Sequence, residues 1–441
     1  MSTDTLLPPD VLFKVALWIE DSATFFAFLE AIGSLRGPPL DLLWRLGLTR
    51  SHNTLWPMLL IENADDESYA ALEATSPLYS RVRVFGTCDV ASLRRHLGRH
   101  VRLEWFNPPL SMVNAPLHEW YADWATLPLT SVVATAAFYP KEPLCTVLPR
   151  LTQLQRLEIG GVRPLAAVLA FAADSMALVH LIVNNTAFTR CTLTAPMLDH
   201  LIQWLQRQPV KTLSLSSIVL NAGELVDGKA AFCTTVLSCP TLNELRLRDV
   251  DLSDLAPMAF VIHAHTVELK GLSVSHLLQL LDPLVAPQLI ELDLWACAVP
   301  PDQAHLLCLF EALATNPTLQ HLYMRHSDLN DEKWHSIVAF LPRLRLKSLR
   351  LAGGEYYLSD ECALKLALAL ETNVELKICM CYGMVLSVQG ATTLLQCLRR
   401  RPVVMQMIAF TLAKGASADQ KKTMRERARD MGTTWIVADE I

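Results

Sequence analysis

The spacing of apolar residues between Leu289 and Val299 constrains the fold of this chain more than any other feature of its sequence. The segment LIELDLWACAV places them in the pattern L-x-x-L-x-L-x-x-C-x-V. An amphipathic helix repeats apolar residues every three or four positions and a half-buried strand repeats them every second position, so neither alone explains the pattern. Leu292 and Leu294 alternate as in a strand, and the outer apolar positions require the chain to bend at both ends of that strand.

The same spacing recurs along the chain. Segments that fit it start at Leu154, Leu178, Val210, Leu242, Ala264, Leu289, Leu319, Leu346 and Asn373. The starts lie on average about 27 residues apart, a period that indicates a stacked array of repeats. One repeat cannot bury its apolar ridge alone, so neighbouring repeats must stack and share a core. Weaker copies extend the predicted array in both directions, near Tyr79, His100, Leu129 and Val404.

These segments resemble the leucine-rich-repeat family, whose pattern is L-x-x-L-x-L-x-x-N/C-x-L. Spacers such as PDQAHLLCLFEAL and DECALKLALAL carry apolar residues at helical spacing, which is similar to the ribonuclease-inhibitor type with one strand and one helix per repeat. The resemblance implies an α/β fold, a horseshoe solenoid with parallel strands inside and helices outside. We expect irregular units around 225–228 and 257–265. Helix N-caps are expected at Asn330 or Asp331, at Ser359 or Asp360, and at Ser417.

Residues 7–44 do not follow the repeat pattern. They resemble the start of an F-box, a helical module that attaches a substrate receptor to a cullin-type ubiquitin ligase. The matching residues include Leu7-Pro8, Asp10-Val11-Leu12, Val15 and the pair Phe25-Phe26. The segment AIGSLRGPPL replaces the V-S-r-x-W-like third helix of that family. The resemblance implies that a ligase adaptor docks on Leu7, Pro8, Val11, Leu12 and Val15. A helical cap that shields the first repeat is the rival interpretation.

In a solenoid of this kind, the side chains that alternate with the buried leucines face the concave surface of the strands. These positions hold Arg246, Arg248, Asp293, Trp295, Tyr323, Arg325, Arg350 and Lys377. Trp, Tyr and Arg are the residue types most enriched at binding hot spots, and here they occur on three successive predicted strands. We therefore predict that this face binds a protein ligand. A solvated face of mixed polar residues is the alternative.

The sequence offers no set of residues for catalysis. It has no Gly-rich phosphate loop, no G-x-S-x-G motif and no kinase motifs. His96 and His100 have a helical spacing that suits a shared metal ion, but no H-E-x-x-H motif and no third ligand accompany them. Cys297 and Cys381 occupy the N/C position of their repeats, where small hydrophobic side chains are buried. We therefore expect no enzyme activity, no metal site and no cofactor.

An aromatic cluster occurs early in the chain. It comprises HEWYADW at 118–124 together with Trp105 and Phe106. Core packing of an atypical repeat is one interpretation, and an exposed patch for a partner is the other.

Composition narrows the classes of partner. Hydrophobic residues make up 51% of the chain and the net charge is -6, which gives no general attraction to nucleic acid or to acidic membranes. No uncharged apolar run suits a membrane span. The N-terminal sequence MSTDTLLPPD lacks the features of a signal peptide, and the 11 cysteines are scattered rather than arranged as in a secreted domain. These features favour an intracellular protein, cytoplasmic or nuclear.

We predict four segments: an F-box-like helical module at 1–50, a bridging segment at 51–78, a leucine-rich-repeat solenoid at 79–412, and a C-terminal capping helix and tail at 413–441. The first function hypothesis is a non-catalytic substrate receptor of a cullin-type ubiquitin ligase. In that hypothesis the N-terminal module holds the adaptor and the concave face holds the protein ligand. The second hypothesis is a leucine-rich-repeat scaffold or regulator without ligase association, similar to GTPase-regulating or immune-receptor modules.

Overall fold

The computed structural model divides into two compact units, 1–189 and 190–441. We describe each unit by itself. The structure describes residues 8–62, 66–109, 116–135, 142–161, 165–186, 191–207, 209–220, 222–252, 261–272, 274–282, 284–295, 303–325 and 329–436.

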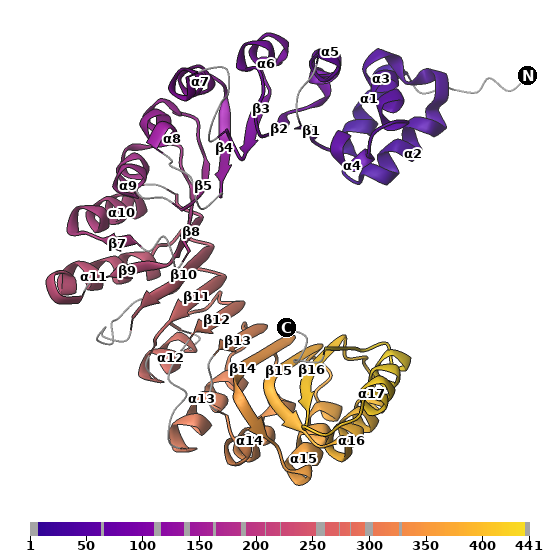
Figure 1. The fold of residues 1–441 in the computed structure, drawn as a ribbon, viewed down its shortest axis with the longest axis vertical. Coiled ribbons are helices and arrows are strands. Elements are labelled where there is room, and N and C mark those ends of the chain that lie inside the picture. Colours follow the sequence, from indigo (N-terminus) through magenta and orange to yellow (C-terminus); the bar gives the residue numbers. More distant parts are fainter. Residues whose placement is uncertain are drawn as a thin grey trace, which may run out of the picture. The chain divides into compact units, whose positions relative to one another are not determined.

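Unit 1 opens with a small helical module and continues as strand–helix repeats (Figure 1). The module contains α1 (Pro9–Trp18), α2 (Ser22–Ile32), α3 (Gly37–Gly47) and α4 (His52–Leu55). The strands are β1 (Leu59–Glu62), β2 (Arg81–Phe85), β3 (Arg102–Phe106), β4 (Leu129–Ala134), β5 (Arg156–Gly160) and β6 (His180–Asn184). The helices between them are α5 (Asp66–Thr75), α6 (Val90–His96), α7 (Leu117–Trp124), α8 (Glu142–Val147) and α9 (Leu165–Asp174).

Unit 2 repeats the same plan. Its main sheet contains β8 (Thr212–Ser216), β10 (Glu244–Asp251), β11 (Thr266–Lys270), β12 (Glu291–Trp295), β13 (His321–Arg325), β14 (Ser348–Tyr357), β15 (Ile378–Leu386), β16 (Met407–Leu412) and β17 (Thr434–Ile436). Two short strands, β7 (Cys191–Leu193) and β9 (Ile218–Leu220), pair separately. The helices are α10 (Ala195–Arg207), α11 (Ala222–Leu237), α12 (Val274–Leu280), α13 (Gln303–Thr315), α14 (Asp331–Ile337), α15 (Asp360–Thr372), α16 (Val388–Arg399) and α17 (Ala418–Asp430).

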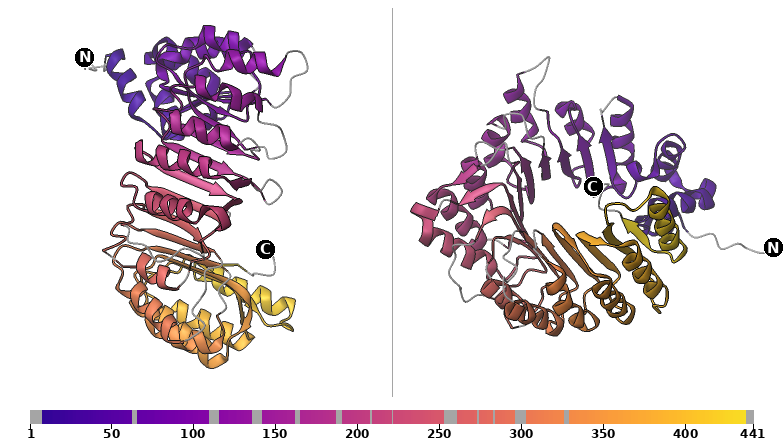
Figure 2. Two further views of the ribbon diagram at one scale, coloured as in Figure 1. Left: turned by 90° about the vertical axis from the view of Figure 1, so that its left-hand side faces the viewer. Right: turned by 60° about the horizontal axis from the view of Figure 1, so that its bottom comes forward.

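Neighbouring strands in each unit are parallel and follow sequence order. In both units the helices cover one face of the sheet and leave the other, which we name the open face, without helices (Figure 2). Short parallel strands joined by helices are the expected consequence of a repeated strand–helix unit. Each unit is therefore an α/β repeat solenoid, and the repeat architecture inferred from the sequence is confirmed.

The buried leucines form ladders because equivalent positions are paired in register. Leu292 lies opposite Val267 on one side and Leu322 on the other, and Leu322 lies opposite Leu349. All of these side chains are buried. In unit 1, Leu157 occupies the same kind of position, between its register partners on β4 and β6. These ladders form the core of each solenoid. Burial of each leucine side chain contributes roughly 1.5–3 kcal/mol to the free energy of folding.

Polar side chains fasten the helix starts of successive repeats in unit 2. The N-caps are Asn330, Ser359, Ser387 and Ser417, so the predicted caps are confirmed. The carboxylate of Asp331, in the first turn of α14, accepts from the backbone N–H of Ser359 at 2.9 Å. The carboxylate of Asp360 likewise accepts from the hydroxyl of Ser387 at 2.5 Å. Each acidic residue therefore holds the cap of the following repeat.

Buried side chains fasten the helix ends in a similar way. Asn316 follows α13. Its side-chain Nδ2 donates to the backbone carbonyl of Leu281, and its side-chain Oδ1 accepts from the backbone N–H of Leu319 at 2.9 Å. Asn373 follows α15 and has the same role toward the preceding repeat. Arg401 takes over this position after α16, where its guanidinium donates to the backbone carbonyls around Asn373. These side chains satisfy buried peptide groups that no helix or strand reaches.

The structure corrects the register of the last predicted repeat. Strands in the better-fitting repeats begin two residues after the first apolar position, but β15 begins at Ile378 rather than 375. The first apolar position is therefore the buried Leu376, and Asn373 is the turn residue before it. Cys381 consequently lies opposite Leu351 in the strand core and not in the N/C position after the strand. Cys297 lies outside the described residues.

Three predicted segments also differ from the structure. The bridging segment 51–78 contains β1, which pairs with β2, so the sheet starts before the predicted solenoid. Residues 225–228, expected as irregular, lie within α11. Of 257–265 only the part from 261 onward is described, and it is irregular as expected. The capping helix α17 is followed by β17, which pairs with β16, so the C-terminal segment still belongs to the sheet.

Candidate functional site

Most of the predicted partner-binding residues of unit 2 lie on the open face in two rows. Strand register aligns Arg246, Glu268, Asp293, Tyr323 and Arg350 in the first row. The second row aligns Lys270, Trp295 and Arg325. The structure therefore brings the predicted aromatic and arginine residues of three neighbouring strands together, which follows from the two-residue period of strand side chains.

Carboxylates hold the arginines at the β10 end of these rows. The Nε of Arg248 donates to Glu268 at 2.7 Å, and Arg246 contacts Glu244 at 2.6 Å. The carboxylate of Glu268 is 2% exposed, and its hydrogen bond holds the pKa of the Arg248 guanidinium above its usual value. These guanidiniums are already engaged within the fold, so they are less available to a partner than their residue type suggests.

The β13–β14 end of the unit 2 face is different. The guanidinium of Arg350, which is exposed, lies 4.7 Å from the centre of the Tyr323 ring, a cation–π geometry. Trp295 is half-buried on the neighbouring strand. Arg325 lies opposite Trp295 by backbone register, and its side chain lies outside the described part of the chain. Lys377 precedes β15 by one residue and does not join either row, because the register of that repeat is shifted.

Sequence reasoning missed a second polar surface, on the open face of unit 1. It consists of Arg81, Arg83, Phe85, Arg102, Glu104, Phe106, Ser131, Arg156, Glu158 and His180, and we name it the unit 1 face. Most of these residues line a hollow of about 430 Å³. The segments RVRVF and RLEWF carry its charged and aromatic residues in the same alternation as the later repeats. That alternation was the signal available in the sequence.

The N-terminal module packs against the first repeat. Phe25 stacks on Trp56 with ring centres 3.9 Å apart, and the indole of Trp56 donates to the carbonyl of Ile19. The hydroxyl of Tyr79 donates to the carbonyl of Leu55 at 2.6 Å. These contacts lie at the start of the sheet, as expected for a cap on an open solenoid end.

The predicted adaptor-docking residues separate into exposed and buried groups. Pro8, Val11 and Val15 are exposed. Leu12 is 5% exposed, so its side chain supports the module core and cannot contact an adaptor. Leu7 lies outside the described residues.

The same helix presents an apolar residue that the sequence analysis did not select. Val11, Val15 and Trp18 share one face of α1, because they are separated by four and three residues. Trp18 is 86% exposed. The helical spacing of this tryptophan was visible in the sequence, but its exposure was not.

The aromatic cluster around 118–124 belongs to the core. Trp105, Trp120, Tyr121 and Trp124 are all buried and pack edge-to-face or stacked against one another. This confirms the core interpretation for these residues. Phe106 is the exception, since it lies on the unit 1 face and stacks on Phe85 with ring centres 4.9 Å apart.

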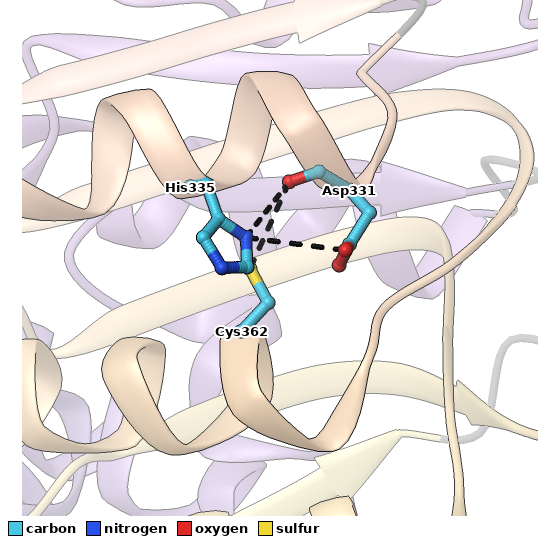
Figure 3. A group of neighbouring side chains, drawn as sticks. All are labelled: Asp331, His335 and Cys362. Carbon is cyan, nitrogen blue, oxygen red and sulfur yellow. Dashed lines mark hydrogen bonds and ion pairs between the residues drawn. The ribbon is translucent and has the colours of Figure 1, made fainter.

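One group of potential metal ligands occurs in the described part of the chain, and it was not predicted. Asp331, His335 and Cys362 bring a carboxylate, an imidazole and a thiol within 4.8 Å of one another (Figure 3). The Nδ1 of His335 lies 3.2 Å from the backbone carbonyl of Asp331 and 3.9 Å from its carboxylate. Burial, followed by the nearby Asp331 carboxylate, raises the pKa of the Cys362 thiol to about 12. The hydrogen bond from the backbone N–H of Ser359 to Asp331 already accounts for the position of this carboxylate.

His96 and His100, whose spacing was noted in the sequence, have separate surroundings. His96 stacks on Tyr69 and lies 3.6 Å from the carboxylate of Glu73. His100 is exposed in the turn that precedes β3.

Comparison with known proteins adds little to this description. No protein-family model matches the sequence, and no curated protein matches it. Among solved structures, the chain is similar to a Bacteroides fragilis protein with 12% sequence identity and a TM-score of 0.28, over 66% of this chain and 67% of that chain. A similarity of that size carries no argument about function. Within the described residues, none of the helices has the length and apolar character needed to cross a membrane.

Proposed function

We propose that this protein is a non-catalytic interaction protein, a substrate receptor of a cullin-type ubiquitin ligase built on repeats of the ribonuclease-inhibitor type. The N-terminal module would dock the ligase adaptor, and the open face of the solenoid would hold the protein to be ubiquitinated. The observation that carries the proposal is the apolar stripe of Val11, Val15 and Trp18 on α1.

This stripe is more than a solenoid cap requires. The capping contacts are made by residues such as Phe25 and Trp56 and by the buried Leu12. Val11, Val15 and Trp18 do not take part in them, and they leave apolar surface in water on a helix next to the chain terminus. A large exposed aromatic side chain flanked by aliphatic ones is typical of a protein-docking surface. The F-box resemblance of the same segment supports an adaptor as the docked protein.

The unit 2 face supports the second half of the proposal. Trp295, Tyr323 and Arg350 lie on three adjacent strands and are the residue types that dominate binding energy at interfaces. The Tyr323–Arg350 pair presents an aromatic ring and a guanidinium already in contact, so little side-chain entropy remains to be lost on binding. We propose this end of the unit 2 face as a contact for the ligand.

Point substitutions test adaptor docking better than truncation of the module. Deletion of residues 1–50 would remove Phe25 and expose Trp56, so loss of binding could then arise from a damaged first repeat. The double variant Val15→Glu/Trp18→Glu changes only exposed side chains. Lys14→Glu, an exposed neighbour on the same helix, is the matched control.

The expected result is that the wild type and Lys14→Glu co-purify with a cullin adaptor from cells, whereas the double variant does not. Thermal unfolding of all three proteins checks that the fold is retained. If the wild type brings down no adaptor, the receptor hypothesis fails and the scaffold without ligase association takes its place. The triple variant Trp295→Ala/Arg325→Ala/Arg350→Ala is expected to keep the adaptor and lose the ligand.

A further inference from the structure

We infer that the unit 1 face binds an extended segment of a partner protein that carries an acidic residue and, two residues further along, an apolar one. The inference rests on the proposed function, because it names the chemistry of the ligand that the solenoid would hold. It is carried by the charges and aromatic rings around the hollow of about 430 Å³.

In the strand register of the unit 1 face, Arg81 lies opposite Arg102 at the start of β2 and β3, and two longer rows follow along the strands. The first row aligns Arg83, Glu104, Ser131, Arg156 and His180. The second row lies two residues further along each strand and aligns Phe85, Phe106, Val133, Glu158 and Ile182. The face therefore has a charged row beside a largely apolar row, about 6.6 Å apart along the strands.

The charged part of the face has more cations than its own carboxylates neutralise. Glu104 lies between Arg81 and Arg83, with its two oxygens 3.2 and 3.0 Å from their guanidinium nitrogens. One carboxylate is thus shared by two arginines. Glu158 is occupied on one oxygen by Arg156 at 2.9 Å and on the other by the amide of Asn184.

Arg102 adds a further positive charge to this group. It lies directly opposite Arg81 in the strand register, and like charges in that arrangement repel each other. Among the described residues the side chain of Arg102 has no hydrogen bond or ion pair, whereas its backbone N–H donates to the carbonyl of Ser80. The side chain of Arg81 is 61% exposed. The four arginines around the hollow therefore exceed its two glutamates by two charges, although the whole chain has a net charge of -6. An incoming carboxylate would relieve this repulsion.

The second row gives the ligand its apolar requirement. Phe85 and Phe106 stack on neighbouring strands, and both are only half-buried. The guanidinium of Arg83 lies 4.7 Å from the centre of the Phe106 ring, so the aromatic pair adjoins the cations. Side chains two residues apart in an extended peptide lie on the same side at about 6.6 Å, the same separation as the two rows. Arg81 already reaches the carboxylate of Glu104, which stands in the first row. An acidic side chain placed over the first row can therefore reach Arg81 and Arg102 while the apolar one packs on the phenylalanines.

Selection from a library of random, unphosphorylated peptides tests this inference with the full-length protein alone. We expect enrichment of peptides with Asp or Glu followed two positions later by an aliphatic or aromatic residue. A selected peptide is then measured by fluorescence anisotropy against Arg81→Ala/Arg102→Ala and against Arg95→Ala/Arg99→Ala. The second variant removes two exposed arginines from α6 and the turn after it, so it is matched in charge.

Loss of the two arginines on the face should weaken binding on the order of tenfold, and the matched control should change it less than about twofold. Replacing the acidic residue of the peptide with its amide should weaken binding to the wild type by a similar factor. Enriched peptides without an acidic residue, or equal binding to both double variants, would overturn the inference. Binding only of a phosphoserine version would assign the arginines to phosphate instead. Because no adaptor is present, these results are independent of whether α1 docks a ligase.

Discussion

Replacement of Asn373 by alanine should destabilise unit 2 far more than the small change in side-chain size suggests. The side chain is 3% exposed and makes four hydrogen bonds. Its amide group donates to the carbonyls of Leu341 and Leu344, and its oxygen accepts from the N–H groups of Glu375 and Leu376. Alanine would remove the acceptor of both N–H groups and one donor from each carbonyl, although the carbonyl of Leu341 keeps the N–H of Leu344.

The magnitude follows from the groups left unpaired. A buried N–H without an acceptor costs about 1–3 kcal/mol, and two such groups are created, while each carbonyl loses one of its donors. Water that enters the space left by the side chain would recover part of this cost. We therefore expect a loss of about 3 kcal/mol in the free energy of unfolding. For a unit of this size the midpoint of thermal unfolding would fall by roughly 6–12 °C.

Asn243→Ala is the matched control for this prediction. The side chain of Asn243 is exposed, and its contacts with the neighbouring repeats come from its backbone N–H and carbonyl, which alanine retains. The same chemical change there should alter the free energy of unfolding by less than about 0.5 kcal/mol. Denaturant titration followed by intrinsic tryptophan fluorescence and by circular dichroism measures both variants. If Asn373→Ala proved as mild as the control, the buried hydrogen bonds would not contribute to stability as we have argued.

Three further outcomes are expected. Leu292→Ala should lower the free energy of unfolding by about 3 kcal/mol, since Leu292 is fully buried in the ladder. A denaturant titration that finds a loss no larger than that of a surface substitution would refute this. The hydrogen bonds of Ser92 and of nearby backbone N–H groups hold the pKa of the Asp89 carboxyl below its usual value. The ionised carboxylate should therefore stabilise α6 fully above the ordinary pKa of about 3.9, and this stabilisation should be lost as the pH falls through the lower pKa of the folded state. Amide exchange of α6 as a function of pH, with Asp89→Asn as the variant that should lack this dependence, measures it. Iodoacetamide should label the exposed Cys308 in the native protein, but it should label Cys381 only after unfolding, because that thiol is buried and its contact with Cys379 raises its pKa. Equal labelling of the two cysteines in the native protein, measured by peptide mass spectrometry, would contradict the burial of Cys381.

The fold could be predicted from the sequence because its signal is repeated. Each better-fitting copy of the spacing placed its strand two residues after the first apolar position, as at Leu289 and β12. The prediction was wrong at β15, where Cys379 and Cys381 replace the leucines that mark a strand. With the apolar markers weakened, Asn373 was taken for the start of the repeat, although it is a turn residue. The strand boundaries of a single repeat can therefore be predicted only where its own apolar pattern is strong, even though the repeat array as a whole is clear.

The candidate site was less predictable than the fold. Alternation identified which residues face away from the core, as at Tyr323 and Arg350. It could not show that Arg248 is held by Glu268 from the next strand, because that contact depends on side-chain conformations across repeats. The cations of the unit 1 face were overlooked for a related reason, since β2 and β3 have weak leucine patterns. The charge and contacts of the open face depend on side chains from neighbouring repeats, whereas the apolar spacing is recognised within a single repeat.

The double attachment of α15 has a consequence for how unit 2 loses structure. Its start is joined to the repeat before it through Ser359 and Asp331, and its end is joined to that repeat through Asn373 and Leu341. A repeat in the middle of the series cannot separate from its neighbours without breaking the hydrogen bonds at both ends of its helix, whereas β17 pairs with β16 alone among the described strands. Unfolding of unit 2 should therefore start at β17 and proceed one repeat at a time toward the interior, and the backbone amides of the interior repeats should be the last to exchange with solvent.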